Sequence, residues 1–364
     1  MGNKQKAVTV KDIANKMNIS LSTVNKALTG KKGISEKRRK EILTLAKKMG
    51  YTVNYAAQAM SRNPLSIGVI MPKNLMWFNY FNYMHMGMVR ELEHLKNNKV
   101  NGFVELVDYK GQLSQVEDAV KKFKEDGVDA IIYCPALYHS EEIGKIFKES
   151  GMPVLLAGAS NKDIESVCTI TIDGKQSGLA AAEFMSLVVP EGKIAVFTGY
   201  KNFEAHKEKV ESFAEKLSEN KNLQLVEVVE TSDKEDIAEE CIKELIRKHP
   251  DIKGIYISTA VAEPICAYIK ENGLSGKIKV LTTDVYPQLI KYVDDNTVAA
   301  TIFQNQVMLG KMAVQSAYEY LTMSRSYCEE EWEMYSQMLI KPQLLMPSAI
   351  KENLDNSGEG YIKR

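Results

Sequence analysis

Residues 9–30 read TVKDIANKMNISLSTVNKALTG, and this stretch decides how the N-terminal part of the chain folds. Thr9 and Asp12 have the spacing of a capping box, and apolar residues follow them at helical intervals. Ser20 is placed to cap a second helix, and Ser35 is placed to cap a third. Two short helices, a turn of about three residues and a third helix make a helix-turn-helix unit.

The second of these helices separates an apolar face from a polar and basic one. The apolar face would pack on the other two helices, and the outer face carries Leu21, Ser22, Asn25 and Lys26. A lysine can donate to guanine, a serine to several base edges, and a leucine can contact a thymine methyl group in the DNA major groove. The alternative is a three-helix packing module with a solvated cationic surface.

Charge is divided unevenly along the chain. The 47 Lys and Arg residues balance the 47 Asp and Glu residues over the whole sequence. Residues 1–62 nevertheless contain eleven lysines and three arginines against three acidic residues, a net charge of +11, which leaves −11 for the rest of the chain. This asymmetry indicates that the basic part binds a polyanion such as double-stranded DNA.

Composition and motifs exclude several other classes of protein. The chain is 45% hydrophobic and 26% charged, as globular proteins are, and no apolar run approaches the roughly 18 residues that span a membrane. The polar N-terminus lacks the apolar core of a signal peptide, so we expect a cytoplasmic protein. Five scattered cysteines and five scattered histidines predict neither a disulfide framework nor a metal site. The absence of nucleophile-elbow, P-loop, zincin and Rossmann motifs favours a protein that is not an enzyme and has no cofactor.

Four motifs of the N-terminal part carry a family resemblance: VKDIA at 10–14, ISLSTVNKALTG at 19–30, ISE at 34–36 and MGY at 49–51. Together they resemble the headpiece of the LacI family of bacterial transcription regulators. The family pattern V-S-x-x-T-V-S-R-x-L-N is changed at three positions here, so the operator sequence does not carry over. The resemblance implies that bases are read by Leu21, Ser22 and Lys26, and that phosphates are held mainly by Ser20, Thr23, Asn25 and Thr29.

The segment NYAAQAMSR follows the headpiece (residues 8–52) and is weakly amphipathic. It resembles the family hinge (here residues 53–63), although the usual P-N-x-x-A-R-x-L is only partly kept. In the family this segment folds on DNA, and its leucine wedges into the minor groove. The resemblance gives that role to Met60 and places Asn54 and Ala57 on the DNA with it. The alternative is a plain linker.

From Leu65 onward, strand-like and helical stretches alternate along the chain. Short apolar runs are separated by amphipathic stretches in two rounds, over about 66–156 and 193–281. Strands that alternate with helices form parallel sheets covered on both faces. We therefore predict an α/β fold with two doubly wound lobes, whose ligands bind beyond the carboxyl ends of the strands.

Further motifs carry a second resemblance: DGVDAII at 126–132, TIDGKQSG at 171–178, HPDIKGI at 249–255 and TVAATIFQN at 297–305. Their order and spacing resemble the sugar-type periplasmic-binding-protein fold that forms the sensor of LacI-family regulators, here residues 65–354. The fold implies three crossings between lobes, near 168–172, 299–303 and 332–338. The N-lobe would then comprise about 65–168 and 303–332, and the C-lobe about 172–299 and 338–354.

The resemblance also implies a cleft between the lobes for a small-molecule effector, a sugar or a sugar derivative. Its ligand residues would be Tyr80, Phe81, Asp108, Lys209, Asp284 and Gln304. Aromatic faces stack on the C–H face of a sugar, and carboxylates and amides at strand ends pair with vicinal hydroxyls. The alternatives are that the rings pack in the core or in a dimer interface, and that the aspartates are ordinary surface residues.

Two departures from the family pattern make this pocket unusual. Lys209 replaces the arginine of R-x-x-G-F, so a bidentate fork becomes a single ammonium. Thr259-Ala260 replaces the usual Asn-Asp, so one carboxylate ligand is missing. Lys207 and Lys209 together leave a sugar acid or phosphate open as the effector, and a solvated helix face explains these lysines equally well.

The function that follows is a ligand-responsive transcription regulator that binds a pseudo-palindromic operator as a homodimer, because one headpiece reads about half a site. In the family, dimer contacts come from N-lobe helices, here about 80–100 and 113–125. Effector in the cleft would change the angle between the lobes and so the meeting of the paired hinges. The alternative is a sugar-binding sensor whose output is a protein partner, with the basic end as a docking device.

Overall fold

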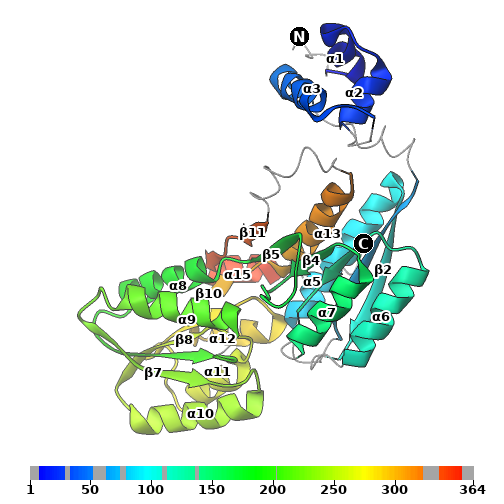
Figure 1. Cartoon of the computed structure of the whole chain (residues 1–364). Coiled ribbons are helices and arrows are strands. Elements are labelled where there is room, and N and C mark those ends of the chain that lie inside the picture. Colours follow the sequence, from blue (N-terminus) through cyan, green and yellow to red (C-terminus); the bar gives the residue numbers. More distant parts are fainter. Residues whose placement is uncertain are drawn as a thin grey trace.

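The computed structural model describes residues 8–28, 33–51, 63–73, 79–108, 113–135, 139–201, 203–322 and 336–354. It contains a helical headpiece and two α/β lobes (Figure 1). No helix within these ranges is long and apolar enough to cross a membrane. The same ranges contain no group of three or more His, Cys, Asp or Glu side chains placed to hold a metal ion.

The headpiece consists of the helices α1 (Val10–Met17), α2 (Leu21–Leu28) and α3 (Glu36–Met49). The capping box of Thr9 and Asp12 is formed at α1, and the Ser35 side chain caps α3 by accepting from a backbone N–H. Their apolar faces enclose one small core, made of Ile13, Ala14, Val24, Ala27, Ile42 and Ala46. The helix-turn-helix prediction is confirmed.

The N-lobe is built on a parallel sheet with the strand order β11-β5-β4-β3-β1-β2. Its strands are β1 (Leu65–Pro72), β2 (Val100–Val107), β3 (Ala130–Tyr133), β4 (Val154–Ala157), β5 (Cys168–Ile172) and β11 (Gln337–Ile340). The helices α5 (Asn79–Leu95), followed by η1 (Lys96–Asn98), and α13 (Gln306–Thr322) share one apolar core with it. A second core lies under α6 (Leu113–Glu125) and α7 (Ser140–Ser150).

The C-lobe sheet has the strand order β12-β10-β9-β8-β6-β7. Its strands are β6 (Gly192–Thr198), β7 (Leu223–Glu230), β8 (Ile252–Ile257), β9 (Lys279–Thr283), β10 (Val298–Phe303) and β12 (Gln343–Leu345). One core lies under α8 (Gly174–Val188) and α9 (Glu204–Leu217), and the other under α10 (Glu235–Lys248), α11 (Ala262–Glu271), η2 (Pro287–Leu289), α12 (Ile290–Asp294) and α15 (Pro347–Leu354). The two-lobe α/β prediction is confirmed, except that β12 runs antiparallel to β10.

The three crossings between lobes lie a few residues later than expected. All of β5 pairs within the first sheet and all of β10 within the second, so the first two crossings follow Ile172 and Phe303. The third lies between Ile340 and Gln343, not at 332–338, because β11 stays paired with β5 through Ile340. The expected C-lobe start at 338 therefore falls inside an N-lobe strand.

Two helices of the N-lobe touch each other through their backbones. A Cβ atom added to Gly87 of α5 would clash with the carbonyl oxygen of Val307, and one added to Gly310 of α13 would clash with that of Met84. The two glycines therefore set the distance between α5 and α13. Because only Gln304 and Asn305 separate β10 from α13, this contact ties a C-lobe strand to the N-lobe.

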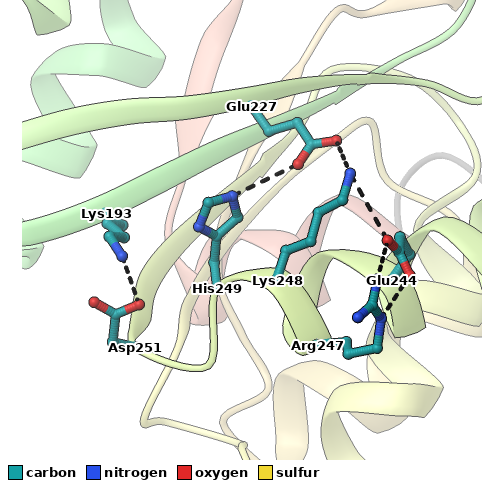
Figure 2. Close-up of polar contacts among 7 residues, drawn as sticks. All are labelled: Lys193, Glu227, Glu244, Arg247, Lys248, His249 and Asp251. Carbon is teal, nitrogen blue, oxygen red and sulfur yellow. Dashed lines mark hydrogen bonds and ion pairs between the residues drawn. The ribbon is translucent and has the colours of Figure 1, made fainter.

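A group of surface ion pairs lies where the end of α10 meets β7, the edge strand of the C-lobe sheet (Figure 2). The Glu227 carboxylate on β7 lies 3.5 Å from Lys248 Nζ and 3.7 Å from His249 Nε2. Further pairs join Arg247 to Glu244 and Lys193 to Asp251. Exposed pairs of this kind contribute little each, so we read the group as surface support for the lobe.

Candidate functional site

The outer face of α2 is the candidate DNA-reading surface. Four of the predicted contact residues are exposed on it or just before it: Ser20, Leu21, Ser22 and Asn25. Leu21 leaves 49% of its surface exposed, so its side chain is free to contact DNA. Thr23 and Lys26 are partly buried at its flanks. The Ser20 hydroxyl accepts from the backbone N–H of Thr23 at 3.1 Å and so caps the helix.

Four other predicted DNA contacts cannot be placed in the same way. Thr29, Asn54, Ala57 and Met60 lie outside the described residues, as does all of the expected hinge except Asn63. Their assigned roles therefore stay predictions.

Arg39, which the sequence did not single out, positions α2 from below. It is only 4% exposed, and its Nη1 donates to the carbonyl oxygen of Lys26 at 3.1 Å. Its Nε also donates to Glu36 at 3.3 Å. The guanidinium thus joins α3 to the end of the helix that carries the base-reading side chains. Arg39 stands in the basic run KRRK, and nothing in that run indicates that this arginine is the buried one.

A pocket lies between the lobes at the carboxyl ends of the strands of both sheets. Its lining includes Tyr80, Phe81 and Thr171 from the N-lobe, and His206, Lys209, Asp233, Thr259, Asp284 and Gln304 from the C-lobe side. Five of the six predicted effector residues are therefore brought together. The strand ends supply most of the polar groups, as parallel α/β sheets require.

Lys209, Gln304 and Asp284 form a buried chain of hydrogen bonds across the pocket floor. Lys209 Nζ donates to Gln304 Oε1 at 2.7 Å, and Gln304 Nε2 donates to Asp284 Oδ2 at 2.8 Å. The backbone N–H of Gln304 donates to the other Asp284 oxygen at 3.2 Å. Lys209 is held in place because α9 lies close against α8, where Gly178 has no room for a Cβ beside the Lys209 carbonyl oxygen. The amide thus connects the cation to the carboxylate.

Burial disfavours both charges of this chain. It lowers the pKa of the Lys209 ammonium, and the carboxylates of Asp284 and Asp233 act in the opposite direction by raising that pKa. Burial raises the pKa of the Asp284 carboxyl, and Lys209 and Gln304 act in the opposite direction by lowering that pKa. The groups therefore depend on one another to stay ionised.

Asp233 brings a second carboxylate to the pocket. It follows β7 in a turn where Ser232 and Asp233 both have left-handed backbones, with φ of 51° and 53°. Its carboxylate accepts a hydrogen bond from the Thr259 hydroxyl. Burial raises the pKa of Asp233. The Thr259-Ala260 pair, which lacks the carboxylate of the family pattern, thus has one beside it from the end of β7, the edge strand of the same sheet.

His206 stands next to Asp233 as a neutral hydrogen-bonding group. Burial and the nearby Lys209 ammonium lower its pKa to about 3. Its Nδ1 accepts from the backbone N–H of Tyr200 at 3.0 Å, so the proton of the neutral ring lies on Nε2. Gly199 makes room for both side chains, because a Cβ there would overlap His206 and Asp233.

The N-lobe wall of the pocket is aromatic and carries no charge among the described lining residues. The rings of Tyr80 and Phe81 meet edge to face with centroids 5.4 Å apart, and Phe203 meets His206 at the same distance from the other lobe. Such surfaces suit the C–H faces of a ring-shaped ligand.

Two residues considered from the sequence lie elsewhere. Asp108, expected in the pocket, is outside it: its carboxylate accepts from Gln115 at 2.8 Å and approaches Lys73 at 3.8 Å. Lys207 is exposed on α9, whereas Lys209 is 6% exposed. The possibility of an anionic effector was based on two lysines. Of these, Lys209 lies in the pocket and Lys207 lies in solvent.

Asp233, His206 and Thr259 were not predicted to take part in the site. Asp233 does follow a strand, which is the rule that found Asp284 and Gln304. His206 has no sequence signal, because a histidine near the start of an amphipathic helix is ordinary.

Two family models match the chain. Residues 67–324 match the family described as periplasmic binding protein domain, and residues 9–54 match the bacterial regulatory proteins of the lacI family. The chain belongs to the periplasmic binding protein domain family, and its headpiece belongs to the lacI family. Both resemblances drawn from the sequence are thereby confirmed.

Curated relatives of this LacI-family protein are regulators. Catabolite control protein A of Staphylococcus aureus (strain Mu50) is 24% identical over 257 residues, which cover 68% of this chain and 70% of the relative. The HTH-type transcriptional regulator pepR1 of Lactobacillus delbrueckii subsp. lactis is 28% identical over 204 residues, 55% of this chain and 57% of the relative. Catabolite control protein A of Staphylococcus epidermidis matches over 52% of its length. The chain thus spans about half to 70% of these relatives.

Solved structures similar to this LacI-family protein are solute-binding proteins. One from Bacillus halodurans, with bound myo-inositol, is 19% identical with a TM-score of 0.66, over 80% of this chain and 97% of that one. GanP of Geobacillus stearothermophilus, a glucose-galactose binding protein, is 18% identical with a TM-score of 0.67, over 79% and 99%. At this identity the likeness establishes the two-lobe fold.

Proposed function

We propose that this LacI-family protein is a cytoplasmic transcription regulator, not an enzyme, whose α2 reads a pseudo-palindromic DNA operator in the major groove. A sugar or sugar derivative in the pocket between the lobes would change its affinity for that operator. The observation that carries the proposal is the joint presence of an exposed reading face on α2 and a closed set of polar strand-end residues around Gln304.

Gln304 lies where a structural change caused by ligand binding would be transmitted from one lobe to the other. It bonds to Lys209 and Asp284 in the C-lobe, and one residue separates it from α13, which packs on the N-lobe sheet. A ligand that contacts this amide therefore acts on both lobes. It shifts DNA binding only by its difference in affinity for the two lobe arrangements.

The proposal includes a homodimer, because one headpiece covers about half of an operator. Pairing would use α5, β2 and α6 of the N-lobe, where Val89 and Leu106 are exposed apolar side chains. The hinge, with Met60 as its minor-groove wedge, would complete the contact with the operator centre.

The test is the salt dependence of DNA binding by the full chain, measured by fluorescence anisotropy on an operator selected from random sequence. Affinity should fall steeply as salt rises, because each neutralised phosphate releases a counterion. A flat response, or no preference for any sequence over bulk competitor, would instead favour a sensor that signals to a protein partner.

A further inference from the structure

Asp233 lies in a loop, but its backbone conformation and side-chain position are fixed by the surrounding structure. Two consecutive non-glycine residues, Ser232 and Asp233, take left-handed backbones to form the turn after β7. Side chains reach this conformation at a cost, and it persists where the surrounding structure fixes it. Gly199 provides the space that the Asp233 carboxylate enters. These features together direct the carboxylate into the pocket.

Few donors reach that carboxylate from the protein. Thr259 provides one hydrogen bond through its hydroxyl. No ion pair to Asp233 is found within the described residues, and the nearby Lys209 ammonium is already bonded to Gln304. A partly buried carboxylate with one hydroxyl donor from the protein has unused acceptor capacity, since each of its oxygens can accept two hydrogen bonds. The pocket therefore offers a ligand an acceptor at this point.

The charges of the pocket do not balance. Its described lining contains one ammonium, Lys209, and two carboxylates, Asp233 and Asp284. His206 contributes no positive charge, because its Nδ1 already accepts the Tyr200 N–H and burial keeps the ring neutral. Lys207 is on the solvent side of α9. An anionic ligand would add a like charge to a site of low dielectric constant, where it is poorly screened.

We propose that the effector is a polyhydroxylated compound without a carboxylate or phosphate group, and that Asp233 selects it by accepting a hydrogen bond from one of its hydroxyl or amino groups. The proposal rests on the sensor function above and narrows it to one class of ligand. The neutral aromatic wall of Tyr80 and Phe81 covers the opposite side, where a ring can lie on apolar surface.

The experiment compares matched sets of ligands on the full chain by isothermal titration calorimetry. Each set contains a parent sugar or cyclitol with its amino, uronic acid and phosphate derivatives where these exist. The neutral or amino member should bind, and its acid and phosphate should bind at least about a hundredfold more weakly because of like-charge contact. An acid or phosphate that binds as tightly as its parent overturns the inference and leaves the sensor function standing. Absence of binding by every compound overturns the sensor function as well.

Two variants assign the selection to Asp233. Asp233→Asn should weaken binding of the neutral ligand about tenfold or more and reduce the discrimination against its acid. Asp236→Asn removes an exposed carboxylate three residues further along the chain and should change neither quantity. If Asp233→Asn left both affinity and discrimination at the level of the unmodified chain, the role of Asp233 would be refuted.

Discussion

Lys209 is the side chain on which the charge balance of the pocket depends. We expect Lys209→Met to lower the free energy of unfolding by about 3 kcal/mol, because Asp284 then remains as a buried carboxylate without a cation. The double variant Lys209→Met with Asp284→Asn should recover most of that loss. Urea unfolding of the full chain measures both.

Lys207→Met provides the matched control for this experiment. It removes the same charge two residues away from an exposed position and should leave the unfolding free energy within about 0.5 kcal/mol of the original. An equal loss in the two lysine variants, or no recovery in the double variant, would show that the Lys209–Gln304–Asp284 chain is not a coupled unit.

Lys26 is the one basic side chain among the predicted base readers on α2. Lys26→Ala should weaken operator binding by about 1–3 kcal/mol and relax the preference at one base position. The measurement is anisotropy titration against a panel of single-base operator variants. A uniform loss across the panel would make Lys26 a phosphate contact instead.

The expectation that ligand residues lie at the carboxyl ends of strands predicted much of the pocket, but it did not decide which aspartates belong to it. It found Asp284 and Gln304, included Asp108 and passed over Asp233. Both β2 and β7 are edge strands, so position in the sheet does not separate Asp108 from Asp233. The difference lies in the local backbone and partners: Asp233 sits in a left-handed turn beside Gly199, whereas Asp108 is held by Gln115 of α6. Sequence alone does not contain that information.

The α2–α3 contact makes the headpiece act as one unit, and Arg39 lies at its centre. Arg39→Ala should destabilise the headpiece by about 1–3 kcal/mol, because the Lys26 carbonyl and Glu36 lose a buried charged donor. DNA affinity should fall for every sequence, with no change in base preference. Arg38→Ala removes a guanidinium whose ion pair with Glu41 is partly exposed and should have little effect. A changed preference with an unchanged melting midpoint would contradict the positioning role.

The α5–α13 contact links the pocket to the N-lobe core. Gly310→Ala should lower the stability of the full chain by about 1–3 kcal/mol, because the new methyl group forces α13 away from the Met84 carbonyl. Ligand binding should weaken too, since Tyr80 lies on α5 and Gln304 adjoins α13. Thermal unfolding with and without ligand measures both effects, and Lys311→Ala at the exposed neighbour is the control. An unchanged melting midpoint would mean that the helices are not in backbone contact.

Elements with a regular pattern were readable from the sequence, and those without one were not. The helix expected at 113–125 is α6 to the residue, because its apolar positions recur at helical spacing. By contrast α8 buries small residues such as Gly178, Ala181 and Ala182 and has no charged stripe to mark its outer face. The short strands β11 and β12 contain too few residues to show alternation, so the sequence pattern could not adjust the third crossing that the family resemblance implied.

The chain joins a basic headpiece to an acidic body, and control of DNA binding by a ligand requires that the two communicate. Within the body, the route from the pocket runs through Gln304, which precedes α13 by two residues, and then through the backbone contact between α13 and α5. A coupling free energy of about 1–3 kcal/mol between two ligand sites is typical of allosteric proteins.

The most direct measurement is operator affinity of the full chain with and without a saturating ligand identified by calorimetry. We expect the ligand to change the dissociation constant by about 5- to 150-fold in one direction, and Asp284→Asn to reduce that change at the same ligand concentration. An operator dissociation constant that stays the same when the pocket is filled would contradict the claim that this site controls DNA binding.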